Sequence, residues 1–143
     1  MTRTPTISDA DAKAALFGPV APVQPVTITL PGYRPKSWNT LYAGKHFRTR
    51  MQYVEEAHDA VKVALQEHPV TPFTVPVAIT ITAFYKGQMT DPDNVSAKLV
   101  IDGLRHAGVI VDDTATYITS VTCISRKDNQ NPRVEIEITP EGL

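Results

Sequence analysis

Residues 91–113 read DPDNVSAKLVIDGLRHAGVIVDD, a stretch that combines strong fold signals with the sharpest chemical pattern in the chain. A carboxylate pair, Asp91 and Asp93, precedes a segment of helical periodicity that carries Lys98. Two adjacent aspartates follow a short apolar run at its end. Carboxylates grouped around one lysine are typical of a site that holds a hard divalent cation against a phosphate.

A helix is predicted between the two carboxylate pairs, because apolar residues recur there every three or four positions. Asp93 or Asn94 can cap its first turn, and Gly108 stands where a glycine ends a helix that runs to about Ala107. A short apolar strand is expected over residues 109–111, before the second pair. The apolar stripe of the helix consists of Ala97, Val100, Ile101, Leu104 and Ala107.

The polar side of this helix has two open interpretations. Asn94, Lys98 and Asp102 follow one another at intervals of four residues and share a face, which Arg105 continues. One interpretation is a solvated face with a weak ion pair between Lys98 and Asp102. The other places the Lys98 ammonium on a scissile phosphate, where it stabilises negative charge in the transition state. Spacing alone does not choose between them.

The first carboxylate pair also has two interpretations. If the preceding strand stays extended to Asp91 and Asp93, both side chains leave the backbone on the same side, and Pro92 helps to fix Asp91. Such a pair suits Mg²⁺, which prefers oxygen ligands. Alternatively, the aspartates cap a helix, and Asp112 and Asp113 form a turn. The presence of both pairs around one helix favours the metal site.

Outside this stretch, the sequence predicts a small sheet and a second helix. A capping box at Thr49 and Gln52 begins a helix that runs to about His68. Strands are expected where β-branched and polar residues alternate, over residues 26–30, 75–85, 117–125 and 133–139. A polar turn over 127–132 is expected to join the last two strands into a hairpin. The order of elements predicts the α+β class, a small mixed β-sheet of about four strands with two helices packed against it.

Composition fits one globular domain and excludes several classes. The chain has 143 residues, 42% of them hydrophobic and 20% charged, which is typical of a folded domain. No apolar run approaches the ~20 residues that a membrane-spanning helix needs, and no signal-peptide pattern is expected at the N-terminus. The single cysteine favours an intracellular, cytoplasmic location. We expect residues 1–24 to form an arm and residues 25–143 the folded domain.

Charge is informative through its distribution along the chain. The net charge of −1 disfavours a protein that coats nucleic acid. From Gly32 to Val54, however, Lys and Arg occur without any Asp or Glu, and aromatic residues lie between them. This basic-aromatic segment, residues 32–54, can contact phosphates and bases; the alternative is a soluble surface with some aromatics in the core. Its basic residues are Arg34, Lys36, Lys45, Arg48 and Arg50, and its aromatic residues are Tyr33, Trp38, Tyr42, Phe47 and Tyr53.

Several motifs occur together in a fixed order. They are DPDN at 91–94, Lys98, DGL at 102–104 and AGVIVDD at 107–113. As a set they resemble the RusA family of Holliday junction resolvases. Weaker similarity extends from the first strand to the C-terminus and includes Pro35, Ser37 and Asn39, so Asn39 joins the five basic residues as a DNA-binding candidate.

The resemblance implies a small dimeric α/β endonuclease, of a kind often encoded by phages or prophages. Such enzymes use Mg²⁺ or Mn²⁺ to nick four-way DNA junctions symmetrically. By position, the resemblance implies three metal-binding, catalytic carboxylates and one catalytic lysine: Asp91, Asp93, Asp113 and Lys98. Asp112 is given a secondary role. The spacing before Lys98 is one residue longer than in the family pattern, and the extra residue falls within 95–97.

Two other functions are compatible with parts of this pattern. Haloacid-dehalogenase-type phosphatases share the superficial features DPDNV and VIVDD, but their fold needs a parallel sheet and more chain between the motifs than is present here. A module that binds branched or single-stranded DNA without cleaving it is the second alternative. The intact set of three aspartates argues against a loss of catalysis.

Overall fold

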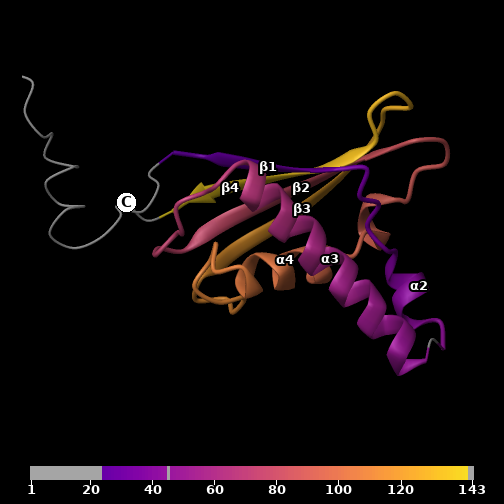
Figure 1. The fold of residues 1–143 in the computed structure, drawn as a ribbon, viewed down its shortest axis with the longest axis horizontal. Helices are drawn as coiled ribbons and strands as arrows, with labels where there is room; N and C mark the ends of the chain where they lie inside the picture. Colours follow the sequence, from indigo (N-terminus) through magenta and orange to yellow (C-terminus); the bar gives the residue numbers. More distant parts are fainter. Residues whose placement is uncertain (1–23, 45, 142–143) are drawn as a thin grey trace, which may run out of the picture.

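The computed structural model describes residues 24–44 and 46–141, which form a four-stranded mixed sheet with two long helices (Figure 1). The predicted α+β class is therefore confirmed. In chain order the elements are β1 (Val26–Pro31), α2 (Trp38–Tyr42), α3 (Phe47–Glu67), β2 (Val77–Tyr85), the 3₁₀ turn η1 (Pro92–Asn94), α4 (Ala97–His106), β3 (Ile118–Lys127) and β4 (Arg133–Pro140). The arm expected over residues 1–24 lies, apart from Gln24, outside the described residues. No helix within the described residues is long and apolar enough to cross a membrane.

The strands follow the order β1-β4-β2-β3, with β4 antiparallel to both of its neighbours and β2 parallel to β3. The expected hairpin of β3 and β4 is therefore wrong, because β2 lies between them. Ile81, in the middle of β2, pairs with Cys123 on one side and Ile136 on the other. β2 buries every second side chain from Val77 to Tyr85, and a central position gives this apolar strand a hydrogen-bonded neighbour along both edges.

Both long helices pack on one face of the sheet (Figure 1). Val61 of α3 and Val100 and Leu104 of α4 share a core with buried strand residues. Each fully buried Val, Leu or Ile side chain contributes roughly 1.5–3 kcal/mol by leaving water. The opposite face carries partly exposed polar side chains such as Thr80 and Glu135. The buried strand residues are Ile28, Leu30, Val77, Ile79, Ile81, Ala83, Tyr85, Val134, Ile136 and Ile138.

Two local predictions around the helices are wrong. α3 begins at Phe47, because His46 rather than Thr49 caps it: His46 Nδ1 accepts a hydrogen bond from the backbone N–H of Arg48 at 3.1 Å. The short strand expected over residues 109–111 is instead a series of bends. The Val109 carbonyl accepts a hydrogen bond from the backbone N–H of Phe73, which lies in the loop before β2 and not in a strand of the sheet.

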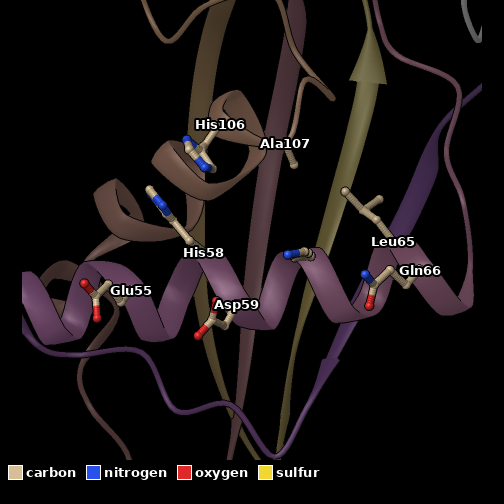
Figure 2. A pocket seen from close by; sticks show the side chains of 8 residues that line it. Glu55, His58, Asp59, Leu65, Gln66, His106 and Ala107 are labelled. Atoms are coloured by element: carbon tan, nitrogen blue, oxygen red, sulfur yellow. The ribbon is translucent and has the colours of Figure 1, made fainter.

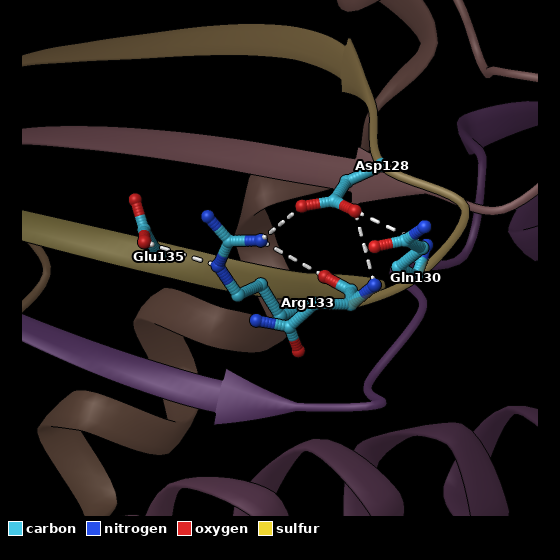
Figure 3. A network of polar contacts seen from close by, with 5 residues as sticks. Asp128, Gln130, Arg133 and Glu135 are labelled. Carbon is cyan, nitrogen blue, oxygen red and sulfur yellow. Dashed lines mark hydrogen bonds and ion pairs between the residues drawn. The ribbon is translucent and has the colours of Figure 1, made fainter.

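The connection from β3 to β4 passes the end of β2 and is held by Asp128 (Figure 3). Asp128 Oδ1 accepts hydrogen bonds from the backbone N–H groups of Gln130 and Asn131 at 3.1 and 3.0 Å. Its Oδ2 accepts from Arg133 Nη1 at 3.0 Å, and Arg133 also pairs with Glu135 at 3.1 Å. The hydrogen bond from Asn131, followed by that from Arg133, holds the pKa of Asp128 below its ordinary value.

Gly103 lets α4 approach α3 closely, and this predicts a stability effect. A Cβ atom at Gly103 would lie 3.0 Å from Val61 Cγ2 and 3.3 Å from the Ala57 carbonyl oxygen. We expect Gly103→Val to lower the free energy of unfolding by about 1–3 kcal/mol, because a stiff side chain and the backbone must shift. Urea denaturation measures this change, with Gln66→Val on the exposed side of α3 as the control. Equal stability of the two variants would contradict the close packing.

Asp128 predicts a pH dependence of stability. Because the pKa of Asp128 is lowered in the folded chain, its ionised carboxylate stabilises the fold at pH values above its ordinary pKa of 3.8. This contribution is lost as the pH falls through the lower value of the folded state. We expect Asp128→Asn to melt below the wild type at pH 7 and to approach it as the pH falls well below 3.8. Thermal melts across this range test the sign, with Glu137→Gln as the control. A difference that does not vary with pH would exclude the proposed role of the carboxylate charge.

Candidate functional site

The basic-aromatic segment lies directly beside the first carboxylate pair. Ser37 forms an isolated antiparallel bridge with Val95, and the backbone N–H of Ser96 donates to the Lys36 carbonyl at 3.1 Å. Val95 and Ser96 are both buried. The chain between η1 and α4 is therefore fixed against the basic-aromatic segment by main-chain pairing.

Asn94 makes a second link between these two parts of the chain. Its side-chain oxygen accepts a hydrogen bond from the backbone N–H of Asn39 at 3.2 Å. That N–H belongs to the first turn of α2, where amides have no partner within the helix. The sequence predicts Asp93 or Asn94 as the cap of α4, but that helix begins after Ser96, and the Asn94 side chain stabilises the start of α2 instead. We call this link and the main-chain pairing the 36–39/94–96 contact.

The first carboxylate pair lies on a turn and not on an extended strand. β2 ends at Tyr85, and the backbone N–H of Asn94 donates to the Asp91 carbonyl at 2.9 Å, which closes the turn at η1. The condition for an extended pair, a strand that continues to Asp91 and Asp93, is therefore not met. Both aspartates are exposed, and α4 begins only at Ala97.

The polar side of α4 differs from the expected arrangement as well. Asn94 lies before the helix, so it does not share a helical face with Lys98 and Asp102. Asp102 Oδ1 lies 3.7 Å from Arg105 Nη2, so the ion pair on this helix joins Asp102 to Arg105. Lys98 lies exposed in the first turn of α4.

The second carboxylate pair is linked to the last turn of α4. Arg105 Nε lies 3.9 Å from Asp113 Oδ2, an exposed ion pair that contributes at most about 1 kcal/mol. Asp112 Oδ1 accepts a hydrogen bond from the backbone N–H of Asp113 at 2.9 Å. Asp112 therefore shapes the turn, whereas Asp113 presents an exposed carboxylate.

The two carboxylate pairs lie near opposite ends of β2. The backbone N–H of Val77 donates to the Tyr117 carbonyl at 2.9 Å, so Asp113, a few residues earlier, lies near the start of β2. The first pair follows Thr90, whose carbonyl accepts a hydrogen bond from Ser125 Oγ near the end of β2. β2 has nine residues, and a strand of that length spans about 30 Å. The pairs are therefore well separated within one chain.

The described residues contain no group of three or more His, Cys, Asp or Glu side chains that could hold a metal ion. The separation of the two pairs explains this, since Asp91, Asp93 and Asp113 do not meet within the chain. Their donor chemistry nevertheless fits a hard cation, because carboxylate oxygens are the ligands that Mg²⁺ prefers. One carboxylate pair alone leaves most coordination positions of such a cation to water or substrate oxygens.

Two of the DNA-binding candidates are held in place by neighbouring side chains. Arg34 Nη2 donates to the Gln88 carbonyl at 2.9 Å, and Lys36 Nζ lies 3.5 Å from Glu56 Oε2. Each cation also lies over a tyrosine ring, at 4.6 and 4.7 Å from the ring centroid. These contacts hold the two cations on the segment whose Lys36 and Ser37 pair with the backbone after η1.

The other candidates gather around α2 and the start of α3. Asn39 is exposed on α2, and Arg48 and Arg50 are exposed in the first turn of α3. Lys45 lies outside the described residues. The candidates that the structure describes therefore follow one another along the chain from the end of β1 to the first turn of α3.

The aromatic residues of the segment differ in burial. Tyr33 packs into the core, and burial, followed by the negative charge of Glu56, raises its pKa to about 12. Tyr33 is therefore a neutral structural residue at neutral pH. Tyr42 and Phe47, by contrast, are exposed on the same segment.

Sequence reasoning misses a cavity of about 540 Å³ between α3 and α4 (Figure 2). His58 and His106 stack at this cavity, with ring centroids 4.5 Å apart and planes 16° from parallel. The nitrogen lone pairs of imidazole lie in the ring plane, so near-parallel rings do not converge on one metal ion. The lining includes none of the predicted site residues. No local signal could find this pair, because its two members lie on different helices.

Residues 22–139 match the model of a protein family described as Endodeoxyribonuclease RusA. The match includes the 36–39/94–96 contact and both carboxylate pairs, and it confirms the resemblance that the motifs indicated. No curated protein matches the sequence at a significant level.

Changing the acceptor at Asn94 tests the 36–39/94–96 contact. We expect Asn94→Ala to destabilise the fold by about 1 kcal/mol, because the start of α2 loses an acceptor. Hydrogen exchange at the Asn39 amide should then become faster. Asn94→Asp keeps an acceptor oxygen and is the matched control, with exchange at Asn39 close to that of the wild type. Unchanged exchange in Asn94→Ala would show that the side chain does not hold α2.

Proposed function

Since the chain belongs to the RusA family of Holliday junction-resolving endodeoxyribonucleases, we propose that it makes paired, symmetric nicks in four-way DNA junctions as a metal-dependent homodimer. The observation that carries the proposal is the 36–39/94–96 contact, which fixes basic side chains beside the first carboxylate pair. Phosphate-binding cations next to metal-binding carboxylates suit the hydrolysis of a phosphodiester.

Asp91, Asp93 and Asp113 would hold Mg²⁺, and Mn²⁺ is expected to substitute because it also binds carboxylate oxygens. When bound, the cation supplies an activated water and stabilises the leaving oxygen. Lys98, exposed in the first turn of α4, would bind the scissile phosphate and stabilise its negative charge in the transition state. The positive end of the α4 dipole acts in the same direction.

The homodimer would also complete each metal site. Asp113 and the first carboxylate pair lie too far apart within one chain to share a cation, as the bonding partners of β2 indicate. In a two-fold dimer, Asp113 of one copy can face Asp91 and Asp93 of the other, and the symmetry creates two such sites. Two equivalent sites account for paired nicks in two strands.

The extra residue before Lys98 is compatible with this proposal, because it lies in the extended link between η1 and α4. Val95 and Ser96 are extended, and the first of them pairs with Ser37. An extra residue in this stretch lengthens the link between η1 and α4. It leaves the helical spacing from Lys98 to Asp102 unchanged.

DNA would be held mainly through its phosphates. Because the chain has a net charge of −1, the attraction comes from the local basic region, and binding should weaken as salt rises. The proposed contacts are Arg34, Lys36, Asn39, Lys45, Arg48 and Arg50.

The alternative function is a module that binds branched or single-stranded DNA without cleaving it. The lack of a three-carboxylate group among the described residues favours it. The two functions are separated by incubating the protein with a four-way junction, a plain duplex and a chromogenic phosphomonoester, with and without Mg²⁺ or Mn²⁺. Symmetric, metal-dependent nicking of the junction alone supports the resolvase. Tight junction binding without nicking supports the binding module.

Removing one proposed ligand should separate cleavage from binding. We expect Asp113→Asn to lower the cleavage rate at least about 100-fold, because the metal loses a charged ligand. The junction dissociation constant should change less than about threefold, since phosphate contacts dominate affinity. Gel-based cleavage and binding assays measure both, with Asp59→Asn, an exposed carboxylate on α3, as the control. Cleavage by Asp113→Asn at the wild-type rate would remove Asp113 from the site.

A further inference from the structure

Two aromatic rings on α2 form a stacked pair that the proposed metal site does not use. Trp38 and Tyr42 are one helical turn apart, with ring centroids 5.7 Å apart and planes 9° from parallel. Trp38 is partly buried against the cluster that contains Leu41 and Ala57. Tyr42, by contrast, is 62% exposed. One ring of the pair is therefore fixed by packing, and the other is open to solvent.

A third ring, Phe47, lies at the start of α3 and is 64% exposed. Single exposed apolar side chains are normal, but several within one short segment indicate a binding surface. A hollow of about 370 Å³ lies along α2 and is lined by Trp38, Asn39, Tyr42 and Ala43. The exposed Tyr42 ring that borders this hollow offers a flat face on which another ring can stack.

The charge around these rings narrows the class of partner. No Asp or Glu occurs between Gly32 and Val54, whereas Arg48 and Arg50 are exposed close to Phe47 in sequence. An aromatic surface flanked by cations fits a single-stranded nucleic acid, because the rings stack on bases while the cations bind phosphates. The cations disfavour an apolar partner, and the exposed rings favour DNA over an acidic protein surface because DNA also supplies flat bases for stacking.

The hollow is also connected to the first carboxylate pair. Asn39 lines it, and the backbone N–H of Asn39 donates to Asn94, the residue after Asp93. A base held in the hollow would therefore contact Asn39, whose backbone is hydrogen-bonded to the turn that carries the proposed metal-binding carboxylates.

We propose that Tyr42, supported by Trp38, and Phe47 form a stacking platform for an unpaired base at the branch point of the DNA. This inference deepens the proposed function and rests on its assignment of branched DNA as the substrate. Bases at a branch point are less constrained by stacking than bases within a duplex, so the platform favours branched over plain duplex DNA.

The test measures DNA binding in EDTA, so that it does not depend on cleavage. Fluorescence polarisation gives the affinities of the full chain for a four-way junction, an oligothymidine strand and a duplex. The Tyr42→Ala/Phe47→Ala double variant should bind the junction and the single strand roughly tenfold more weakly, and the duplex less than threefold more weakly. Tyr42→Phe, which keeps the ring, should bind like the wild type. Val63→Ala, another exposed apolar residue on α3, is the control.

Three results would overturn the platform. They are unchanged binding of the junction and single strand by the double variant, an equal loss on all three DNAs, and a change in oligomeric state that assigns the rings to a protein interface. Thermal melts show that the variants are folded. If the wild type bound junctions in a ring-dependent manner but never nicked them with Mg²⁺, the platform would stand and the proposed cleavage would fall.

Discussion

The 36–39/94–96 contact is the interaction on which the rest of the site depends. Its main-chain part gives the buried backbone N–H of Ser96 an acceptor, the Lys36 carbonyl, and places Val95 opposite Ser37. Because this stretch links η1 to α4, the contact sets where the first carboxylate pair lies relative to Lys98. The same contact holds the basic segment after β1 and, through Asn94, the start of α2. The first carboxylate pair, Arg34, Lys36 and the start of α2 are thus positioned by two paired pieces of backbone.

The second constraint is the rigidity of α4. A ten-residue helix is about 15 Å long, and α4 is held against α3 and the sheet by Leu99, Val100 and Leu104. Such a helix does not bend to bring Asp113 to Asp91. Within the proposed nuclease, one chain therefore supplies two incomplete parts of a metal site. This makes dimerisation a requirement of the proposed chemistry and not only a means of cutting two strands.

The four strands are predictable from sequence, because alternation with a period of two is a local pattern that the burial of one sheet face enforces. Their order is not local: nothing in residues 127–132 indicates that this turn passes the end of β2. Asn94 illustrates the same limit, since its amide caps a helix that lies far away in the sequence. The aspartates are recognisable as a motif, but their separation depends on how the chain returns along α4. The exposure of Tyr42 likewise depends on tertiary packing, which buries part of Trp38 and leaves the Tyr42 ring in solvent.

Mixing two inactive variants tests most directly whether each metal site combines carboxylates from two copies. Asp91→Asn and Asp113→Asn should each disable both sites of a homodimer. A mixed dimer keeps one intact site, with Asp91 from one copy and Asp113 from the other. We therefore expect co-expressed, differently tagged variants to regain Mg²⁺-dependent nicking of one strand of a four-way junction. Mixed dimers that form, as shown by purification through both tags, but do not nick would contradict the composite site.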